Sequence, residues 1–153
     1  MAGSLGRERE HVRGRVWLVL CLALAVHVVD EALSGFVPQA NNLLRGIARE
    51  FQLSGAPQLS FAGWLVVVSV AVLLLLMLTG SVSRRASMTR LFPHAVAWVL
   101  LANGLGHIAV SVSVGRMMAG VLSSPLLLLV SIWALARLRH APGSAAVAQG
   151  AVA

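Results

Sequence analysis

The chain has 153 residues, of which 58% are hydrophobic and 11% charged, and its mean hydropathy is +0.86. This balance excludes an ordinary water-soluble domain, in which about 25% of residues are charged. The net charge is +7 and every basic residue is arginine. Because the arginines form short clusters at the edges of apolar runs, they are typical of a membrane protein and exclude nucleic acid as a partner. We therefore expect a multi-pass protein of a bacterial-type cytoplasmic membrane, with the lipid bilayer as its main partner.

Four apolar segments are each long enough to cross a bilayer, and they cover residues 16–36, 61–80, 91–114 and 118–138. At about 1.5 Å per residue, roughly 20 helical residues cross a hydrocarbon layer of about 30 Å. Pro125 is expected to bend the fourth helix near its start. The sequence predicts an all-α membrane protein, an up-and-down bundle of four transmembrane helices over 16–140. A mobile basic arm (1–15) precedes the bundle and a disordered tail (141–153) follows it.

The longest connection, residues 37–60, carries apolar side chains at helical spacing. Leu43, Leu44, Ile47 and Phe51 fall on one face if this stretch is helical. The pattern favours a short helix in the outer membrane interface. An irregular loop is the alternative.

The arginines also predict the orientation of the bundle, because cytoplasmic loops carry the positive excess. Three arginines lie on the side of the first and third loops: Arg45, Arg49 and Arg116. The other nine lie on the opposite side: Arg7, Arg9, Arg13, Arg15, Arg84, Arg85, Arg90, Arg137 and Arg139. Both termini are therefore expected to be cytoplasmic. Trp17 and Trp64 are the candidates for aromatic belt residues at the interfaces.

A competing interpretation is a cleavable signal peptide. The basic start, the apolar run and Ala32-Leu33-Ser34 resemble such a leader. The apolar run is long for a leader, however, and two acids directly precede the cleavage-like site. We therefore favour a retained first helix.

Two groups of polar residues interrupt the first and third apolar segments. His27, Asp30 and Glu31 have spacings of three and four, so they share one helical face. Counted from the last arginine before each segment, His27 and Glu31 lie about 18 and 24 Å into the membrane. Asn103 and His107 lie about 20 and 26 Å in by the same count. The two segments run in the same direction across the membrane, so the two groups of polar residues are expected at the same depth in the bilayer.

Each buried acid costs on the order of 3 kcal/mol in a bilayer, so these side chains are expected to face the bundle interior. The small residues Ala102, Gly104 and Gly106 permit a close approach of the first helix to the third. Arg116, beyond the end of the third segment, can extend back toward a carboxylate. Asn103 and Arg116 are therefore expected to support the site.

The stretches HVVDE and NGLGH resemble the two motifs of the HXXEE-domain family, small bacterial membrane proteins with an H-x-x-E-E and an N-x-x-x-H motif. The resemblance matches His27 to the motif histidine and Asp30 and Glu31 to its two acids. It matches Asn103 and His107 to the second motif. It covers most of the spanning region and implies no particular biochemical activity.

The chain departs from this family pattern at two places. Asp30 replaces the first glutamate of the motif and is about one methylene shorter. A later Y-x-P-G element corresponds to residues 117–120, where only Gly120 fits. We interpret Met117 and Met118 in this stretch as part of a tight outer turn and not as a copper site.

The first functional hypothesis is a metal site with His27 and His107 as nitrogen ligands and Asp30 and Glu31 as oxygen ligands. Such a set suits Zn²⁺ or Fe²⁺ and leaves a position open for water or substrate. The reaction would be hydrolysis or oxidation of a lipid-soluble substrate. Glu31 is then the candidate general base, with Asp30 as the second candidate catalytic acid.

Three other interpretations remain open at this stage. The same residues suit a proton relay in a small proton-coupled transporter. Haem ligation by the two histidines is disfavoured by the neighbouring acids. The residues can also form a purely structural polar network, in a homo-oligomer or in an accessory subunit of a larger membrane complex. Elemental analysis of the purified protein separates the metal hypothesis from the others.

Overall fold

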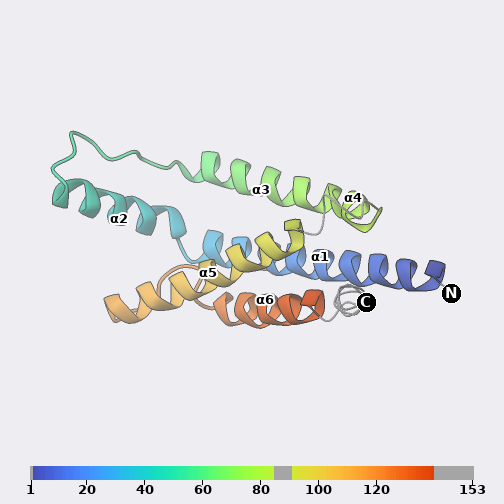
Figure 1. The fold of residues 1–153 in the computed structure, drawn as a ribbon. Helices are drawn as coiled ribbons and strands as arrows, with labels where there is room; N and C mark the ends of the chain where they lie inside the picture. The colour runs from blue at the N-terminus through green and yellow to red at the C-terminus, as the bar shows by residue number, and fades with distance from the viewer. Residues whose placement is uncertain (1, 85–90, 140–153) are drawn as a thin grey trace.

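This computed structural model describes residues 2–84 and 91–139, in which helices are joined by turns and irregular segments and no strand occurs. The helices are α1 (Ala2–Leu33), α2 (Phe36–Glu50), α3 (Phe61–Met77), α4 (Thr79–Arg84), α5 (Leu91–Val114) and α6 (Ser124–Arg139). The long helices lie roughly along one direction, and α2 continues beyond the carboxyl end of α1 (Figure 1). The predicted all-α class is confirmed, and α5 has the predicted bounds. The expected tail, 141–153, lies outside the described residues.

In the amino-terminal half of the chain, two helix boundaries in the structure differ from those expected from the sequence. Helix α1 begins at Ala2, so the arm that was expected to be mobile continues directly into the first apolar segment. Its arginines and glutamates are good helix formers, which favours this continuation. The second apolar segment divides into α3 and α4 at Leu78. Threonine, glycine and serine follow Leu78 and have lower helix propensity than the leucines before it.

The fourth helix begins later than predicted, at Ser124 instead of residue 118. The chain before it turns at Gly115 and Gly120, whose φ angles are +68° and +79°, values that glycine adopts far more readily than other residues. Pro125 therefore lies in the first helical turn, where its missing N–H has no helical partner to lose. Because Pro125 stands at the start of α6, it does not produce the bend that the sequence had suggested.

The predicted helix of the first loop is present as α2, and polar contacts near its amino-terminal end fix its position. Gly35, with a φ of +76°, ends α1 and turns the chain into α2. The Gln39 amide donates to the Ser34 carbonyl over 3.1 Å, and its oxygen accepts from the Ala119 N–H over 2.8 Å. These bonds join α2 to the turn that precedes α6.

The buried core lies among α1, α5 and α6. Its buried members are Val16, Leu20, Ala23, Ala97, Leu100, Leu127, Ala134, Leu135 and Leu138. A Cβ on Gly104 would lie 3.2 Å from the Ser124 carbonyl oxygen, so this glycine brings α5 close to α6. The sequence had assigned that close approach to α1. Ala102 and Gly106 are exposed instead.

Trp17 is also buried, with none of its surface exposed, and its indole N–H donates to the Leu75 carbonyl of α3 over 2.8 Å. It is therefore a packing residue between α1 and α3, contrary to the prediction of a belt position. Trp64 is only partly buried and packs on the Phe36 ring, with 5.4 Å between ring centroids.

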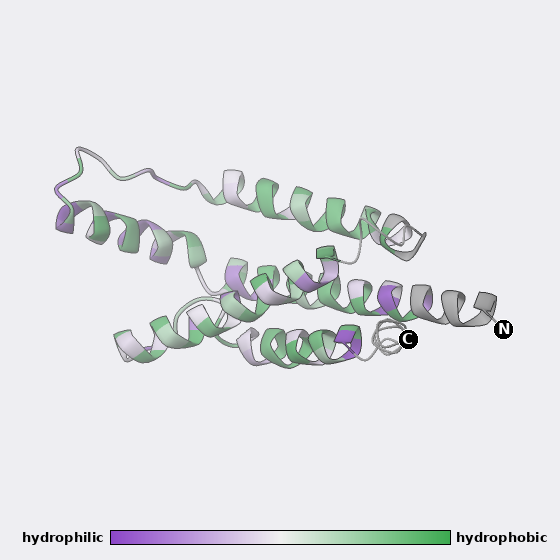
Figure 2. Cartoon of the chain, in the orientation of Figure 1, coloured by the Kyte–Doolittle hydropathy of each residue, from purple (hydrophilic) through white to green (hydrophobic). Residues whose placement is uncertain are grey.

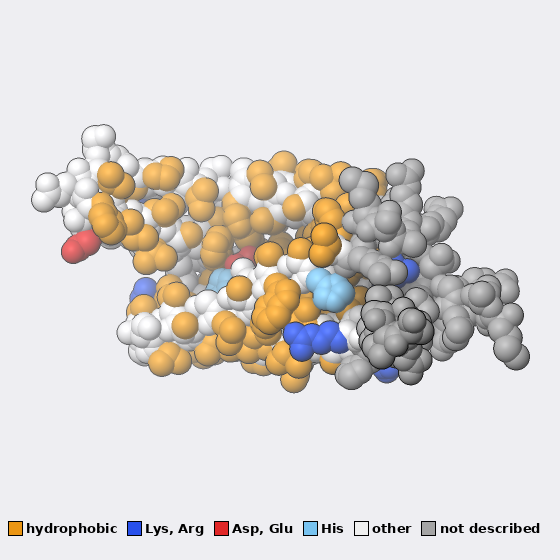
Figure 3. Space-filling model, in the orientation of Figure 1, with side chains coloured by type: hydrophobic (Ala, Val, Ile, Leu, Met, Phe, Trp, Pro, Cys, Tyr) orange, Lys and Arg blue, Asp and Glu red, His pale blue; other side chains and the backbone are white. Residues whose placement is uncertain are grey.

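The outer surface of the described helices is strongly apolar. Helix α3 contains no buried residue, although it is almost entirely hydrophobic (Figure 2). Hydrophobic side chains also spread over the face seen in Figure 3. Two helical stretches are long and apolar enough to cross a membrane, namely His11–Leu33 and Leu91–Val114. Helix α3 is apolar over a shorter length, Phe61–Met77.

Candidate metal centre

Three side chains from α1 and α5 converge at one point. His27 and Glu31 lie one helical turn apart on α1, and His107 reaches them from α5, which runs in the same direction (Figure 1). Glu31 Oε1 is 3.1 Å from His107 Nε2 and 3.6 Å from His27 Nε2. The two imidazole rings meet edge to face, with 4.9 Å between centroids. One ligand atom from each residue lies within 4.8 Å of the others.

The cluster is shielded from its surroundings. His27 is 1% exposed and Glu31 is 7% exposed, while His107 is partly buried. His27 Nε2 is buried and has no hydrogen-bond partner among the described residues. A buried nitrogen without a partner is costly, commonly by about 1–3 kcal/mol, and native structures rarely leave one. This atom therefore indicates a position for a cation or a proton at the centre of the cluster.

The other side of the His27 ring is fixed by a chain of hydrogen bonds. Ser123 Oγ lies 2.7 Å from His27 Nδ1 and 2.7 Å from Asp30 Oδ2, and the Ser123 N–H donates to the same carboxylate oxygen over 2.8 Å. A carboxylate only accepts, so the Ser123 hydroxyl donates to Asp30 and accepts from His27 Nδ1–H. In the neutral ring, the lone pair of Nε2 consequently faces Glu31 and His107.

Asp30 thus lies behind His27 and outside the cluster. Its other carboxylate oxygen accepts from Ser34 Oγ over 3.2 Å, and the Ser34 hydroxyl also donates to the Asp30 carbonyl oxygen. This differs from the expectation that both acids are direct ligands. Adjacent residues on a helix point about 100° apart, and here Glu31 is directed at the two histidines while Asp30 is directed at Ser123.

The turn before α6 closes over both rings. A Cβ on Gly120 would lie 2.9 Å from His107 Nδ1 and 3.0 Å from His27 Cε1. Only a glycine leaves room for both imidazoles here, and its φ of +79° independently favours glycine. Gly120 and Ser123 were not predicted from the sequence as residues of the site. Gly120 was the one residue that matched the Y-x-P-G element of the family, and this match was the signal in the sequence that could have placed it in the site.

The two supporting residues that the sequence suggested do not join the cluster. Asn103 is exposed and lies one helical turn before His107 on α5. Arg116 is exposed in the turn after α5, and within residues 2–84 and 91–139 it forms no ion pair with Asp30 or Glu31. Gly115 turns the chain away at the end of α5, so the arginine does not extend back along the helix.

A comparison with protein families shows to which family this chain belongs. A family described as a protein of unknown function with an HXXEE motif matches residues 17–134. The chain belongs to this family. The match includes α5 and most of α1, so it contains every residue of the cluster. Comparisons with curated proteins and with solved structures give no match.

The three side chains that converge in this HXXEE protein are of types that could hold a metal ion. Two imidazoles and one carboxylate are typical of Zn²⁺ and Fe²⁺ sites that keep a position open for water or substrate. In a tetrahedral zinc site the ligand atoms lie about 3.3 Å apart. The two distances to Glu31 Oε1, 3.1 and 3.6 Å, bracket that value, whereas the full set of three ligand atoms lies within the wider limit of 4.8 Å.

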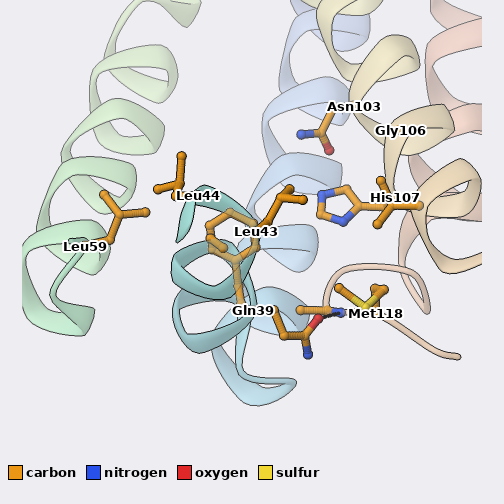
Figure 4. Close-up of a pocket in the computed structure, with 12 residues that line it drawn as sticks. Gln39, Leu43, Leu44, Leu59, Asn103, Gly106, His107 and Met118 are labelled. Atoms are coloured by element: carbon orange, nitrogen blue, oxygen red, sulfur yellow. Dashed lines mark hydrogen bonds between the residues drawn. The ribbon is translucent and has the colours of Figure 1, made fainter. Parts of the chain in front are cut away.

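A pocket of about 460 Å³ adjoins the cluster in the HXXEE protein. It lies between α2, α5 and the start of α3, as Figure 4 shows. Leucines of α2 and Leu59 form much of its wall, and Asn103 and His107 of α5 are its polar side chains near the cluster. His107 belongs to both the cluster and the pocket. The pocket therefore provides a route to one ligand of the candidate metal centre.

Proposed function

We propose that this HXXEE protein binds one divalent transition-metal ion, Zn²⁺ or Fe²⁺, through His27, Glu31 and His107. The observation that carries the proposal is Nε2 of His27, a side chain that is 1% exposed: this nitrogen has no hydrogen-bond partner among the described residues and converges with the other two ligand atoms. A metal ion satisfies all three lone pairs at once. On the far side of the ring, His27 Nδ1–H donates to Ser123 Oγ, which in turn donates to Asp30 Oδ2, and this chain of hydrogen bonds holds the ring as ligating histidines are usually held.

We place this centre inside a membrane-spanning bundle of four helices. Two stretches, in α1 and α5, have spanning length, and the largely exposed apolar surface of α3 needs a nonpolar solvent. Helices α3 and α6 have 17 and 16 residues and are therefore about 25 Å long, somewhat less than the thickness of the hydrocarbon layer. Local thinning of the bilayer, or residues that flank each helix, can accommodate this difference. The arginine distribution places both termini in the cytoplasm. Helix α2 then lies in the outer interface of the cytoplasmic membrane.

The chemistry that we infer is hydrolysis of a lipid-soluble substrate at the open metal position. A metal held by these three residues would activate a bound water or polarise a substrate carbonyl. In this arrangement Glu31 is a ligand, and Asp30 positions His27 through Ser123. The structure therefore supports a positioning role for Asp30 over the catalytic role that its sequence position suggested.

Elemental analysis tests the proposal. The purified full-length protein is analysed as isolated and after incubation with Zn²⁺, or with Fe²⁺ without oxygen. We expect about one ion per chain for the wild type, and loss of that ion in Glu31→Gln and in His107→Ala. The matched control is His11→Ala, because His11 is exposed near the start of α1. A wild type that neither carries nor gains metal, or a His107→Ala protein that keeps it, refutes the proposal.

A second candidate function is a proton relay. The separation of 3.1 Å between His107 Nε2 and Glu31 Oε1 is a hydrogen-bond distance, so this pair can hold a proton in place of a metal. The protein would then act as a small proton-coupled transporter. If the relay operates, wild-type protein without bound metal moves protons in proteoliposomes, and Glu31→Gln stops this movement. The metal proposal instead requires an ion bound to the wild type.

A further inference from the structure

We propose that the pocket beside the cluster binds a single-chain lipid with one carbonyl group, its chain against the α2 leucines and its carbonyl at Asn103. That this lipid is the substrate rests on the proposed metal function, while its binding does not. The pocket volume of about 460 Å³ is within the range of about 300–1,000 Å³ that holds drug-sized ligands. One extended chain fits such a volume better than a two-chain phospholipid.

The distribution of polar groups in the pocket indicates where the ligand's polar group lies. Gln39 uses its amide nitrogen for Ser34 and its oxygen for Ala119. Asn103 makes no side-chain hydrogen bond within the described residues, and it stands one turn from His107 in the same pocket wall (Figure 4). Its carboxamide N–H can donate to a carbonyl oxygen. The adjacent metal centre would polarise that same carbonyl group.

The apolar end of the pocket is open at the surface of the helices. Leu43 is 55% exposed and Leu59 is 39% exposed, although both line the pocket. In the proposed bundle these side chains face lipid near the outer interface. A ligand can therefore enter sideways from the bilayer, with its chain remaining in an apolar environment throughout.

Photolabelling in lipid nanodiscs tests this inference. Wild-type protein in phosphatidylcholine nanodiscs is irradiated with a long-chain fatty acid methyl ester that carries a diazirine near the chain end. We expect mass spectrometry to locate the label on Leu43, Leu44 or Leu59. Label confined to the outer face of α3 would overturn the inference, since it would report only general contact with lipid.

A pair of glycine variants provides the matched control. Gly106 lines the pocket and Gly46 does not, yet both are helical glycines with nothing within 4 Å of an added Cβ. The Cβ of Gly106→Leu therefore meets no neighbour, and the rest of the side chain should occupy part of the pocket. We expect it to reduce pocket labelling by about tenfold or more, and Gly46→Leu to leave labelling unchanged. Equal labelling in the two variants would overturn the inference.

The role of Asn103 is tested by comparing two probes. Asn103→Leu should weaken labelling by the ester about fivefold to tenfold, the usual effect of one lost hydrogen bond. It should leave labelling by a matched diazirine alkane unchanged, and equal loss for both probes would argue against the carbonyl contact.

Metal content separates the two proposals. A metal-free wild type with the expected labelling would end only the metal proposal, whereas a metal-loaded Gly106→Leu protein with wild-type labelling would end only this one.

Discussion

The substitution Gly120→Ala is expected to abolish metal binding although it removes no ligand. The new Cβ would lie 2.9 Å from His107 Nδ1 and 3.0 Å from His27 Cε1. Normal contact needs about 3.5 Å, so the two rings and the turn must separate by about 0.6 Å. Metal–ligand distances tolerate only about 0.2 Å. We therefore expect the affinity for Zn²⁺ to fall by at least about tenfold, as when a ligating histidine loses its orientation.

The matched control for this variant is Gly115→Ala. Gly115 has a similar φ of +68°, but an added Cβ would meet nothing within 4 Å. Both variants should lose about 1–2 kcal/mol of stability from the left-handed backbone, and only Gly120→Ala should lose metal. The assay is competition with a chromogenic Zn²⁺ chelator, with thermal unfolding followed by circular dichroism. Equal Zn²⁺ affinities in the two variants would show that the turn does not shape the site.

Three further substitutions test other parts of the structure. Ser123→Ala removes the hydroxyl that orients the His27 ring, so the same chelator competition should show Zn²⁺ affinity about 10–100-fold lower. Trp17→Phe keeps a buried ring but leaves the Leu75 carbonyl without its indole donor, and should lower the free energy of unfolding by about 1 kcal/mol. A cysteine at Arg45 should react with a membrane-impermeant maleimide added to intact cells, because the proposed topology puts this residue outside.

Each of these tests has a control within the chain. Ser113→Ala removes an exposed serine hydroxyl that bonds only to the Ala109 carbonyl among the described residues, and should retain full Zn²⁺ affinity. Trp98→Phe changes an exposed tryptophan and should leave stability nearly unchanged. The native Cys21 is buried, so the wild type should remain unlabelled. Labelling at Arg45 only after the cells are opened would contradict the proposed orientation.

The helical class and the shared level of the two histidines could be derived from the sequence. Residues 91–114 were predicted as one helix, and the structure gives α5 the same bounds. The rise per residue then fixed how far His27, Glu31 and His107 lie along their helices, and in the structure these three side chains are in contact. A helix has one rise and one period, so distances along its axis follow from counting residues.

The parts of the site contributed by turns could not be derived in this way. Ser123 and Gly120 lie in an irregular stretch that the sequence analysis had treated as the start of the fourth helix. Their contacts with His27 depend on where α6 begins, and Pro125 sets that start only together with the two glycine turns. No periodicity describes such a stretch, so its geometry has to be observed.

The sequence by itself determined that the chain is helical, which residues share a helical face, and how deep each lies along its axis. Only the tertiary structure decided which helices are neighbours and how each is rotated. It placed Gly104 against α6 and Trp17 against α3, and it turned Asp30 toward Ser123 and away from the cluster. The physical reason is that local backbone geometry fixes position along a helix, while rotation and neighbours result from the packing of all helices together.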